Sequence, residues 1–205
     1  MPDLTPPSSE SAGARDAQAP GRLCPWWLGY LLACPLRRLF DSPAKLLAPH
    51  VRPGMTVLEP GPGMGFYTLE LARLAGASGR VIAVDVQPRM LRTLERRATK
   101  AGLRERLTTR LATGNALGLD DLAGMVDFTL ACAVVHEVPS AAAFFRDVAR
   151  ASKPGARLLF VEPAGHVTAQ HFEAEVQAAR DAGFRLVESH LPCRGHSALL
   201  ERTGA

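Results

Sequence analysis

One stretch decides the fold of this 205-residue chain: Val57-Leu58-Glu59-Pro60-Gly61-Pro62-Gly63-Met64-Gly65-Phe66-Tyr67. It predicts an apolar strand that ends in an acidic residue, a loop with glycine at every second position, and the start of a helix over residues 61–75. Glycines allow a ligand to approach the backbone, and a helix N-terminus presents unpaired N–H groups. The stretch is therefore typical of a nucleotide-binding loop.

The glycine spacing argues against a dinucleotide ligand. In the pyrophosphate-binding pattern G-x-G-x-x-G, the third glycine would fall at position 66, where this chain has Phe66. Glu59 would also bring a carboxylate towards a doubly anionic pyrophosphate, which costs energy. A cationic ligand is favoured instead, and S-adenosylmethionine, with its sulfonium and ammonium groups, is one.

A second acid follows at the end of the next predicted strand. Asp85 ends an apolar run over residues 81–85, and its carboxylate can accept hydrogen bonds from both hydroxyls of a ribose. Capping of the following helix is its alternative role. Val86, Gln87 and Met90 follow closely enough to line an adenine pocket, although Met90 is equally consistent with a place in the core.

Five elements, in this order, resemble the class I S-adenosylmethionine-dependent methyltransferases. They are the E-x-G-x-G-x-G loop, Asp85, the Gly114-Asn115-Ala116 turn, the strand over residues 126–130 and the Lys153-Pro154-Gly155 turn. The nearest resemblance is to the small-molecule branch that contains the quinone-biosynthesis C-methyltransferases and the arsenite methyltransferases. It implies an enzyme that transfers a methyl group from S-adenosylmethionine to a small molecule.

The resemblance also implies roles for individual residues. The three loop glycines approach the methionine part of the cofactor, and Glu59 holds its ammonium directly or through water. Asn115 stands where the family often has an Asp that accepts a hydrogen bond from the adenine amino group, and an amide oxygen can accept the same bond. The residues expected at the cofactor are Glu59, Gly61, Gly63, Gly65, Asp85, Val86, Gln87, Met90, Asn115, Ala116 and Ala131.

The segment after the fourth predicted strand, residues 132–139, is expected beside the transferable methyl group. It lacks the Asn/Asp/Ser-Pro-Pro-aromatic motif of enzymes that methylate amino groups of nucleic acids, which favours a small acceptor. His136 is a candidate general base because its ordinary pKa of about 6.5 suits deprotonation near neutrality. A purely structural hydrogen bond is its alternative role, and Glu137 is a second candidate. A thiolate or enolate-like acceptor would need only alignment.

Strand and helix patterns alternate along most of the chain. This alternation predicts an α/β, Rossmann-like, doubly wound and mostly parallel seven-stranded sheet that ends in an antiparallel hairpin. Pro88 is predicted in the first turn of a helix, and Ser140 and Thr168 are predicted N-caps. The predicted strands are residues 56–59, 81–85, 107–111, 128–131, 157–161, 185–188 and 196–201.

Composition predicts one globular domain, with 47% apolar and 21% charged residues and a net charge of +4. Residues 1–22, rich in Pro, Ser, Ala and Gly, predict a disordered tail without a secretory signal. Residues 23–45 predict a helical segment, bent or split at Pro35, that covers the cofactor or packs on the sheet edge. Its apolar run is too short to cross a bilayer. Residues 46–205 are predicted to form the cofactor-binding methyltransferase domain.

The cysteines and arginines leave alternatives open. The chain contains Cys24, Cys34, Cys132 and Cys193 without a C-x-x-C pair, which indicates reduced thiols in a cytoplasm and no metal site. A thiol or metalloid methyltransferase is an alternative function, and so is a non-catalytic regulatory module that binds the cofactor. The arginine-rich residues 89–110 predict a solvated helix face, and nucleic acid is not an expected partner because no aromatic residues interleave with them. The pattern predicts no oligomeric state.

Overall fold

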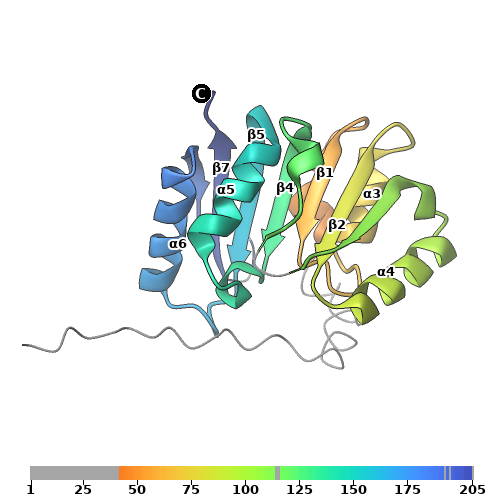
Figure 1. Cartoon of the computed structure of the whole chain (residues 1–205), viewed down its shortest axis with the longest axis horizontal. Coiled ribbons are helices and arrows are strands. Elements are labelled where there is room, and N and C mark those ends of the chain that lie inside the picture. Colours follow the sequence, from red (N-terminus) through yellow and green to blue (C-terminus); the bar gives the residue numbers. More distant parts are fainter. Residues whose placement is uncertain (1–41, 114–115, 192, 194, 205) are drawn as a thin grey trace, which may run out of the picture.

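The computed structural model describes residues 42–113, 116–191, 193 and 195–204. They form a seven-stranded sheet between two layers of helices (Figure 1). The strands are β1 (Thr56–Pro60), β2 (Arg80–Asp85), β3 (Leu107–Leu111), β4 (Val126–Cys132), β5 (Ser152–Glu162), β6 (Phe184–Ser189) and β7 (His196–Arg202). The helices are α2 (Pro43–Leu47), α3 (Thr68–Ala75), α4 (Pro88–Lys100), α5 (Ala141–Ala151) and α6 (Ala169–Asp181), with 3-10 turns η2 (Arg104–Arg106), η3 (Asp120–Leu122) and η4 (Val135–Glu137).

The strand order in the sheet is β3-β2-β1-β4-β5-β7-β6. Strands β1 to β5 pair in parallel, whereas β7 runs antiparallel to both β5 and β6. The predicted fold class is confirmed, including the C-terminal hairpin. The chain winds outwards in opposite directions from β1 and β4, and doubly wound sheets bind ligands beyond the carboxyl ends of the strands at such a point.

Each face of the sheet carries its own apolar cluster. Helices α5 and α6 cover one face, where Phe145 and Val176 pack in the same cluster as Phe160 of β5. Helices α2, α3 and α4 cover the other face, where Leu71 and Leu94 are fully buried. Burial of a side chain of this size contributes roughly 1.5–3 kcal/mol, so the two clusters hold the layers together and fix the strand ends between them.

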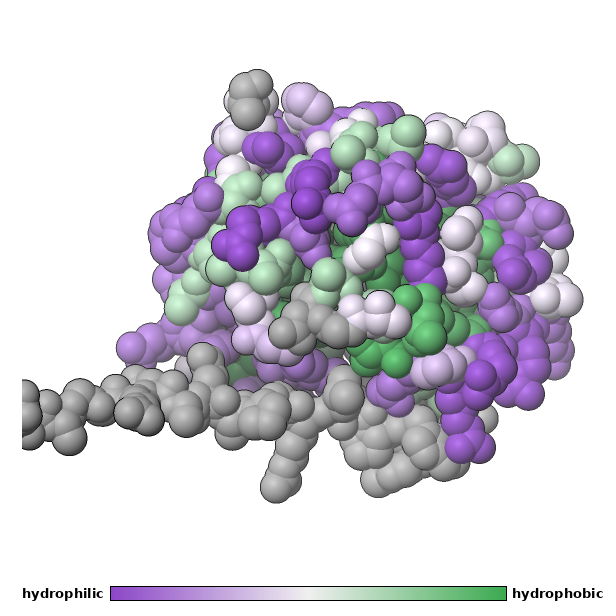
Figure 2. Space-filling model, in the orientation of Figure 1, coloured by the Kyte–Doolittle hydropathy of each residue, from purple (hydrophilic) through white to green (hydrophobic). Residues whose placement is uncertain are grey.

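Local sequence signals place most of the helices correctly. The Ser140 hydroxyl accepts a hydrogen bond from the Ala143 N–H at 3.2 Å, and Thr168 caps α6 in the same way. Pro88 occupies the first turn of α4, as predicted. The apolar residues of α4 point inwards, and its exposed arginines give that side of the molecule the hydrophilic surface seen on the right of Figure 2.

The predicted start of the first helix is wrong. Helix α3 begins at Thr68, and residues 61–67 form a turn-rich loop. Gly61, Gly63 and Gly65 have φ angles of 68°, 53° and 85°, which a right-handed helix does not contain. The glycines therefore shape a loop between β1 and α3 and belong to no helical turn.

The Lys153-Pro154-Gly155 turn is also placed differently. These residues lie inside β5, at a shift in the β4–β5 register between Val126 and Phe128. Extra residues opposite a shorter stretch of the partner strand form a bulge, which bends the strand locally. The sequence signal for a turn thus corresponds to an irregularity within a strand.

The predicted tail and almost all of the predicted N-terminal helical segment lie outside the described residues. The first described helix, α2, begins at Pro43 after Ser42, whose hydroxyl accepts a hydrogen bond from the Lys45 N–H at 3.4 Å. Helix α2 runs across residue 46, where the methyltransferase domain is predicted to begin. The position of this domain boundary remains a prediction. Among the described helices, none has both the length and the apolar character needed to cross a membrane.

Candidate active site

The carboxyl edge of the parallel strands gathers the acidic side chains and the histidine singled out in the sequence. Glu59 is the penultimate residue of β1, and Asp85 is the last residue of β2. His136 lies in η4, directly after β4. Because β1 pairs with both β2 and β4, these side chains come from neighbouring positions along one edge of the sheet.

Glu59 is a buried carboxyl group with an unused acceptor. Its residue is 3% exposed, and its Oε2 atom has no hydrogen-bond partner within the described residues. Burial raises the pKa of Glu59 to about 8, the charge of Asp85 adds to this, and the Thr68 hydroxyl opposes it. A buried acceptor without a donor is costly. This site therefore fits a ligand that brings a cationic N–H donor, such as the ammonium of S-adenosylmethionine.

The three glycines of the loop have different roles. A Cβ atom on Gly61 would lie 2.7 Å from Val134 Cγ2, and one on Gly65 would collide with the Leu94 side chain. A Cβ atom on Gly63 would meet no heavy atom within 4 Å. Gly61 and Gly65 are thus required by packing, whereas Gly63 leaves open space in which a ligand can approach the backbone.

Asp85 is held in place by backbone donors. Its Oδ1 atom accepts a hydrogen bond from the Gln87 N–H at 2.8 Å, and Gln87 is the N-cap residue of α4. Burial raises the pKa of Asp85, whereas the N–H groups of Gln87, Gly63 and Val86 lower it. The Oδ1 atom of Asp85 therefore does bind the backbone at the start of the following helix, which is the alternative role named above. Since a carboxylate has about four lone-pair sites, acceptor capacity remains for a ribose.

Exposed apolar side chains flank Asp85. Val86 is 45% exposed and Leu111 is 50% exposed, and the β2–β3 register pairs Leu111 with Asp85. Leu111 was missed by sequence reasoning, although its place at the end of the third predicted strand was the available signal. Two apolar side chains beside a ribose acceptor offer the flat contact surface that an adenine ring needs.

The remaining predicted cofactor residues differ in accessibility. Gln87 is half-buried and Met90 is only 4% exposed, so the core role is the better supported one for Met90. Ala131 is fully buried within the apolar cluster under α5 and α6. Ala116 is exposed and forms a β-bridge with Thr113. Asn115 lies outside the described residues.

His136 makes a short contact with an acid that sequence reasoning missed. Its Nδ1 atom lies 2.6 Å from Oε2 of Glu162, the last residue of β5. The hydrogen bond to Glu162 raises the pKa of His136, burial opposes this, and the charges of Glu162, Glu137 and Glu175 add to the rise. The available signal was a third apolar strand ending in a carboxylate, after those that end in Glu59 and Asp85.

The segment that carries His136 touches the glycine loop. Val134 lies against Gly61, and Ala133 has a φ of 54°, an uncommon conformation for a residue with a side chain. Glu137 places its Oε1 atom 4.0 Å from His136 Nε2. The structure thus brings the two candidate catalytic residues to the same edge as the glycine loop.

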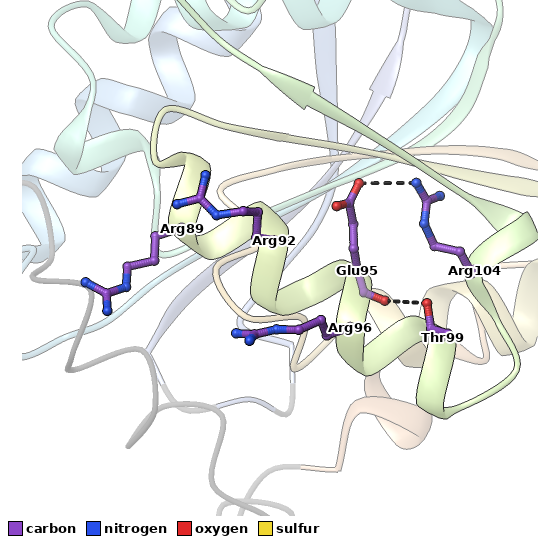
Figure 3. Close-up of a pocket in the computed structure, with 6 residues that line it drawn as sticks. All are labelled: Arg89, Arg92, Glu95, Arg96, Thr99 and Arg104. Atoms are coloured by element: carbon purple, nitrogen blue, oxygen red, sulfur yellow. Dashed lines mark hydrogen bonds and ion pairs between the residues drawn. The ribbon is translucent and has the colours of Figure 1, made fainter.

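A cavity of ≈ 790 Å³ lies elsewhere, along the solvent side of α4. In Figure 3, Arg104 pairs with the Glu95 carboxylate at 3.2 Å, and the Thr99 hydroxyl donates to the Glu95 carbonyl at 3.0 Å. The lining residues are Arg89, Arg92, Glu95, Arg96, Thr99 and Arg104. The cavity includes none of the acids at the carboxyl edge, which agrees with the predicted solvated helix face.

Comparison with known proteins identifies relatives of the sheet and its glycine loop. A family model described as a methyltransferase domain matches residues 58–160, half of the chain. The chain is 33% identical over 115 residues to the ribosomal protein L11 methyltransferase of Pelotomaculum thermopropionicum, covering 56% of this chain and 34% of the relative. It is 31% identical to the ubiquinone/menaquinone biosynthesis C-methyltransferase of Pasteurella multocida, covering 55% and 41%. The matches thus span less than half the length of these two relatives.

A solved structure extends the likeness to most of the chain. The structure of an S-adenosylmethionine-dependent methyltransferase from Aquifex aeolicus superposes with a TM-score of 0.75 and 26% identity, covering 87% of this chain and 98% of that one. The family match also includes the glycine loop between β1 and α3. The chain belongs to the class I S-adenosylmethionine-dependent methyltransferases.

Proposed function

We propose that this chain binds S-adenosylmethionine at the carboxyl edge of its sheet and transfers the methyl group to a small-molecule acceptor. The observation that carries the proposal is the buried Glu59 carboxyl, whose Oε2 atom has no hydrogen-bond partner within the described residues, together with the open space at Gly63. The name of the quinone-biosynthesis relative supports a small acceptor, whereas the name of the other relative refers to a ribosomal protein. The acceptor class is therefore the part that most needs an experiment.

Each cofactor contact follows from the chemistry of one residue. Glu59 binds the ammonium, the backbone around Gly63 approaches the methionine part, and Asp85 accepts from the ribose hydroxyls. When bound, S-adenosylmethionine supplies an electrophilic methyl group on its sulfonium. The other proposed contacts are Gly61, Gly65, Val86, Gln87, Asn115 and Ala116, whereas Met90 and Ala131 are buried and are assigned to the core.

His136 is the proposed general base for an acceptor with an O–H or S–H group. Its ring is half-buried at the segment that touches the glycine loop, with side-chain exposure of 19%. Glu137, 4.0 Å from Nε2, is the second candidate. A neutral imidazole near physiological pH can take a proton from the acceptor, which contributes typically 10²–10⁴-fold to a rate.

Calorimetry with S-adenosylmethionine and with S-adenosylhomocysteine tests cofactor binding. Asp85→Ala is expected to weaken both affinities by at least about 30-fold, because two hydrogen bonds to a charged group are lost. Asp121→Ala is the matched control, since the Asp121 side chain is 63% exposed and pairs with Arg110. An unchanged affinity in Asp85→Ala removes the ribose assignment, and failure of both ligands to bind the natural chain at millimolar concentration removes the proposal.

Methyl transfer itself is tested with labelled S-adenosylmethionine and a panel of small acceptors. Binding without labelled product on any acceptor would favour the regulatory module. Loss of transfer in Cys132→Ser or Cys193→Ser, with cofactor binding intact, would favour the thiol or metalloid methyltransferase. Both residues are half-buried in the structure, whereas Cys24 and Cys34 lie outside the described residues.

The glycine loop gives a prediction that separates packing from binding. Gly63→Ala is expected to destabilise the fold by about 1–2 kcal/mol, the cost of a left-handed residue with a side chain, and to weaken cofactor binding. Gly61→Ala is expected to cost about 1–3 kcal/mol more, because its Cβ also collides with Val134. Urea denaturation and calorimetry measure the two effects. Equal stability of the two variants would contradict the packing role of Gly61.

A further inference from the structure

Glu162 binds both the backbone and the ring of the segment that carries the candidate base. It is fully buried at the end of β5. Its Oε1 atom accepts the Val135 N–H at 2.8 Å and the His136 N–H at 3.4 Å, while its Oε2 atom lies 2.6 Å from His136 Nδ1. A buried carboxylate that accepts several N–H groups makes strong, oriented hydrogen bonds.

Helix α6 adds a second buried acid to this neighbourhood. Glu175 is 4% exposed, and burial, followed by the charge of Glu162, raises its pKa to about 7, against the opposing influence of His136. Its Oε1 atom lies 3.3 Å from His171 Nε2. Glu175 therefore responds to the charge of Glu162, and its own partner is a different histidine.

The other titratable side chains around Glu162 also have separate contacts. The His166 ring lies 5.9 Å from the His136 ring. His196 is the register partner of Glu162 across β5 and β7, and its Nε2 atom contacts the Val167 carbonyl at 3.1 Å. Within the part of the chain that the structure describes, no three such side chains are arranged to hold a metal ion. The only carboxylate on Nδ1 of His136 among these residues is that of Glu162.

We propose that Glu162 is a positioning residue that keeps the ring proton of His136 on Nδ1 and so leaves Nε2 as the proton acceptor. This inference rests on the proposed methyl transfer. In the neutral ring, an Nδ1–H that donates to Glu162 fixes the tautomer, and the lone pair then lies on Nε2. Nε2 takes the proton of the acceptor O–H or S–H, the electron pair stays on that oxygen or sulfur atom, and the imidazolium later releases the proton to water.

The second contact of Glu162 makes this arrangement rigid. Because the same carboxylate also accepts the Val135 and His136 N–H groups, its position relative to the backbone of this segment is fixed, and its Oε2 atom stays in place to accept the Nδ1–H of the ring. The β4–β5 pairing, in which Cys132 lies opposite Val161, sets the distance between the two strand ends. The orientation of His136 is thus built into the central sheet.

The test is Glu162→Gln, observed through the ring nitrogens of His136 by ¹⁵N NMR in the ligand-free protein, at a pH above the titration of this ring as followed in the same experiment. The natural chain is expected to show the proton on Nδ1. In the variant, the amide oxygen can still accept the Val135 N–H, while the amide nitrogen donates to Nδ1, so the proton is expected on Nε2. Glu173→Gln is the control, because Glu173 lies on α6 with a 67% exposed side chain.

Kinetics supply a second readout. Glu162→Gln is expected to lower kcat by about 10²-fold or more while leaving the affinity for S-adenosylmethionine unchanged. A natural chain with its proton on Nε2, or a variant with an unchanged tautomer, would overturn the inference. Because the tautomer is measured without cofactor, failure of the protein to bind the cofactor would contradict the proposed function and would leave the assignment of the tautomer intact. If Glu162→Gln does not fold, the spectrum of the natural chain still decides.

Discussion

Glu59→Gln is expected to stabilise the cofactor-free protein at pH 8. Burial raises the folded-state pKa of Glu59 to about 8 from its ordinary value of 4.5, so between these pH values the folded protein keeps a proton that the unfolded chain has lost. Stability therefore falls as pH rises through this window, by up to about 1.4 kcal/mol per pH unit. A neutral amide removes this dependence.

Urea denaturation at about pH 5 and pH 8 measures this change in the free energy of unfolding. Because the pKa of Glu175 is also raised, to about 7, the free energy of unfolding of the variant still falls as pH rises, but by a smaller amount. Glu105→Gln, a change at an exposed residue of η2, is the control and is expected to leave the natural pH dependence intact. An identical pH dependence in Glu59→Gln and the natural chain would show that the buried carboxyl does not carry this cost.

The same substitution is expected to weaken S-adenosylmethionine binding by about 30-fold to 10³-fold, because the ammonium loses its charged partner. Binding at pH 7 should also release a proton, since Glu59 is protonated in the free protein and ionises to meet the ammonium. Calorimetry in buffers of different ionisation enthalpy measures that proton. Its persistence in Glu59→Gln would assign it to another group.

His136→Ala carries the second large effect. We expect kcat to fall by about 10²–10⁴-fold, the usual contribution of a general base, while the affinity for the cofactor is unchanged. In the natural chain, kcat/KM should rise with pH and level off only above the ordinary histidine pKa of about 6.5, because the contact with Glu162 raises the pKa of His136 and the base must be neutral.

Steady-state kinetics against pH test this prediction, with His171→Gln as the control because that side chain is 49% exposed on α6. A kcat within about twofold of the natural value would remove the base assignment and would point to an acceptor that needs only alignment. The contact with Glu162 also affects stability in a definite direction. Its contribution is complete below the unfolded pKa and is lost as pH rises through the raised folded pKa.

The sequence allowed the sheet to be predicted because the central strands β1, β2, β4 and β5 contain short apolar runs with their own boundaries. Glu59 and Asp85 were found for the same reason, since an acid that ends such a run stands out. Helix starts depended on the signal available: Ser140 and Thr168 cap their helices as predicted, whereas the start of α3 required the φ angles of the loop glycines.

Glu162 could not be assigned a role from the sequence because its partner is distant along the chain. His136 follows β4 and Glu162 ends β5, with all of α5 between them. Only the pairing of these two strands brings the carboxylate to Nδ1. Leu111 reaches the edge in the same way, through the register that sets it opposite Asp85. Contacts across a sheet follow from register, which local patterns do not specify.

The contact between Gly61 and Val134 couples sequence changes in the glycine loop to sequence changes in the segment that carries His136. A side chain at position 61 is excluded partly by Val134, so a smaller residue at 134 removes part of the barrier to a change at 61. The two positions should show epistasis, with a double-mutant cycle giving a coupling that neither single change reveals. Any adaptation of the acceptor segment to a new substrate is therefore constrained by the loop that serves the cofactor.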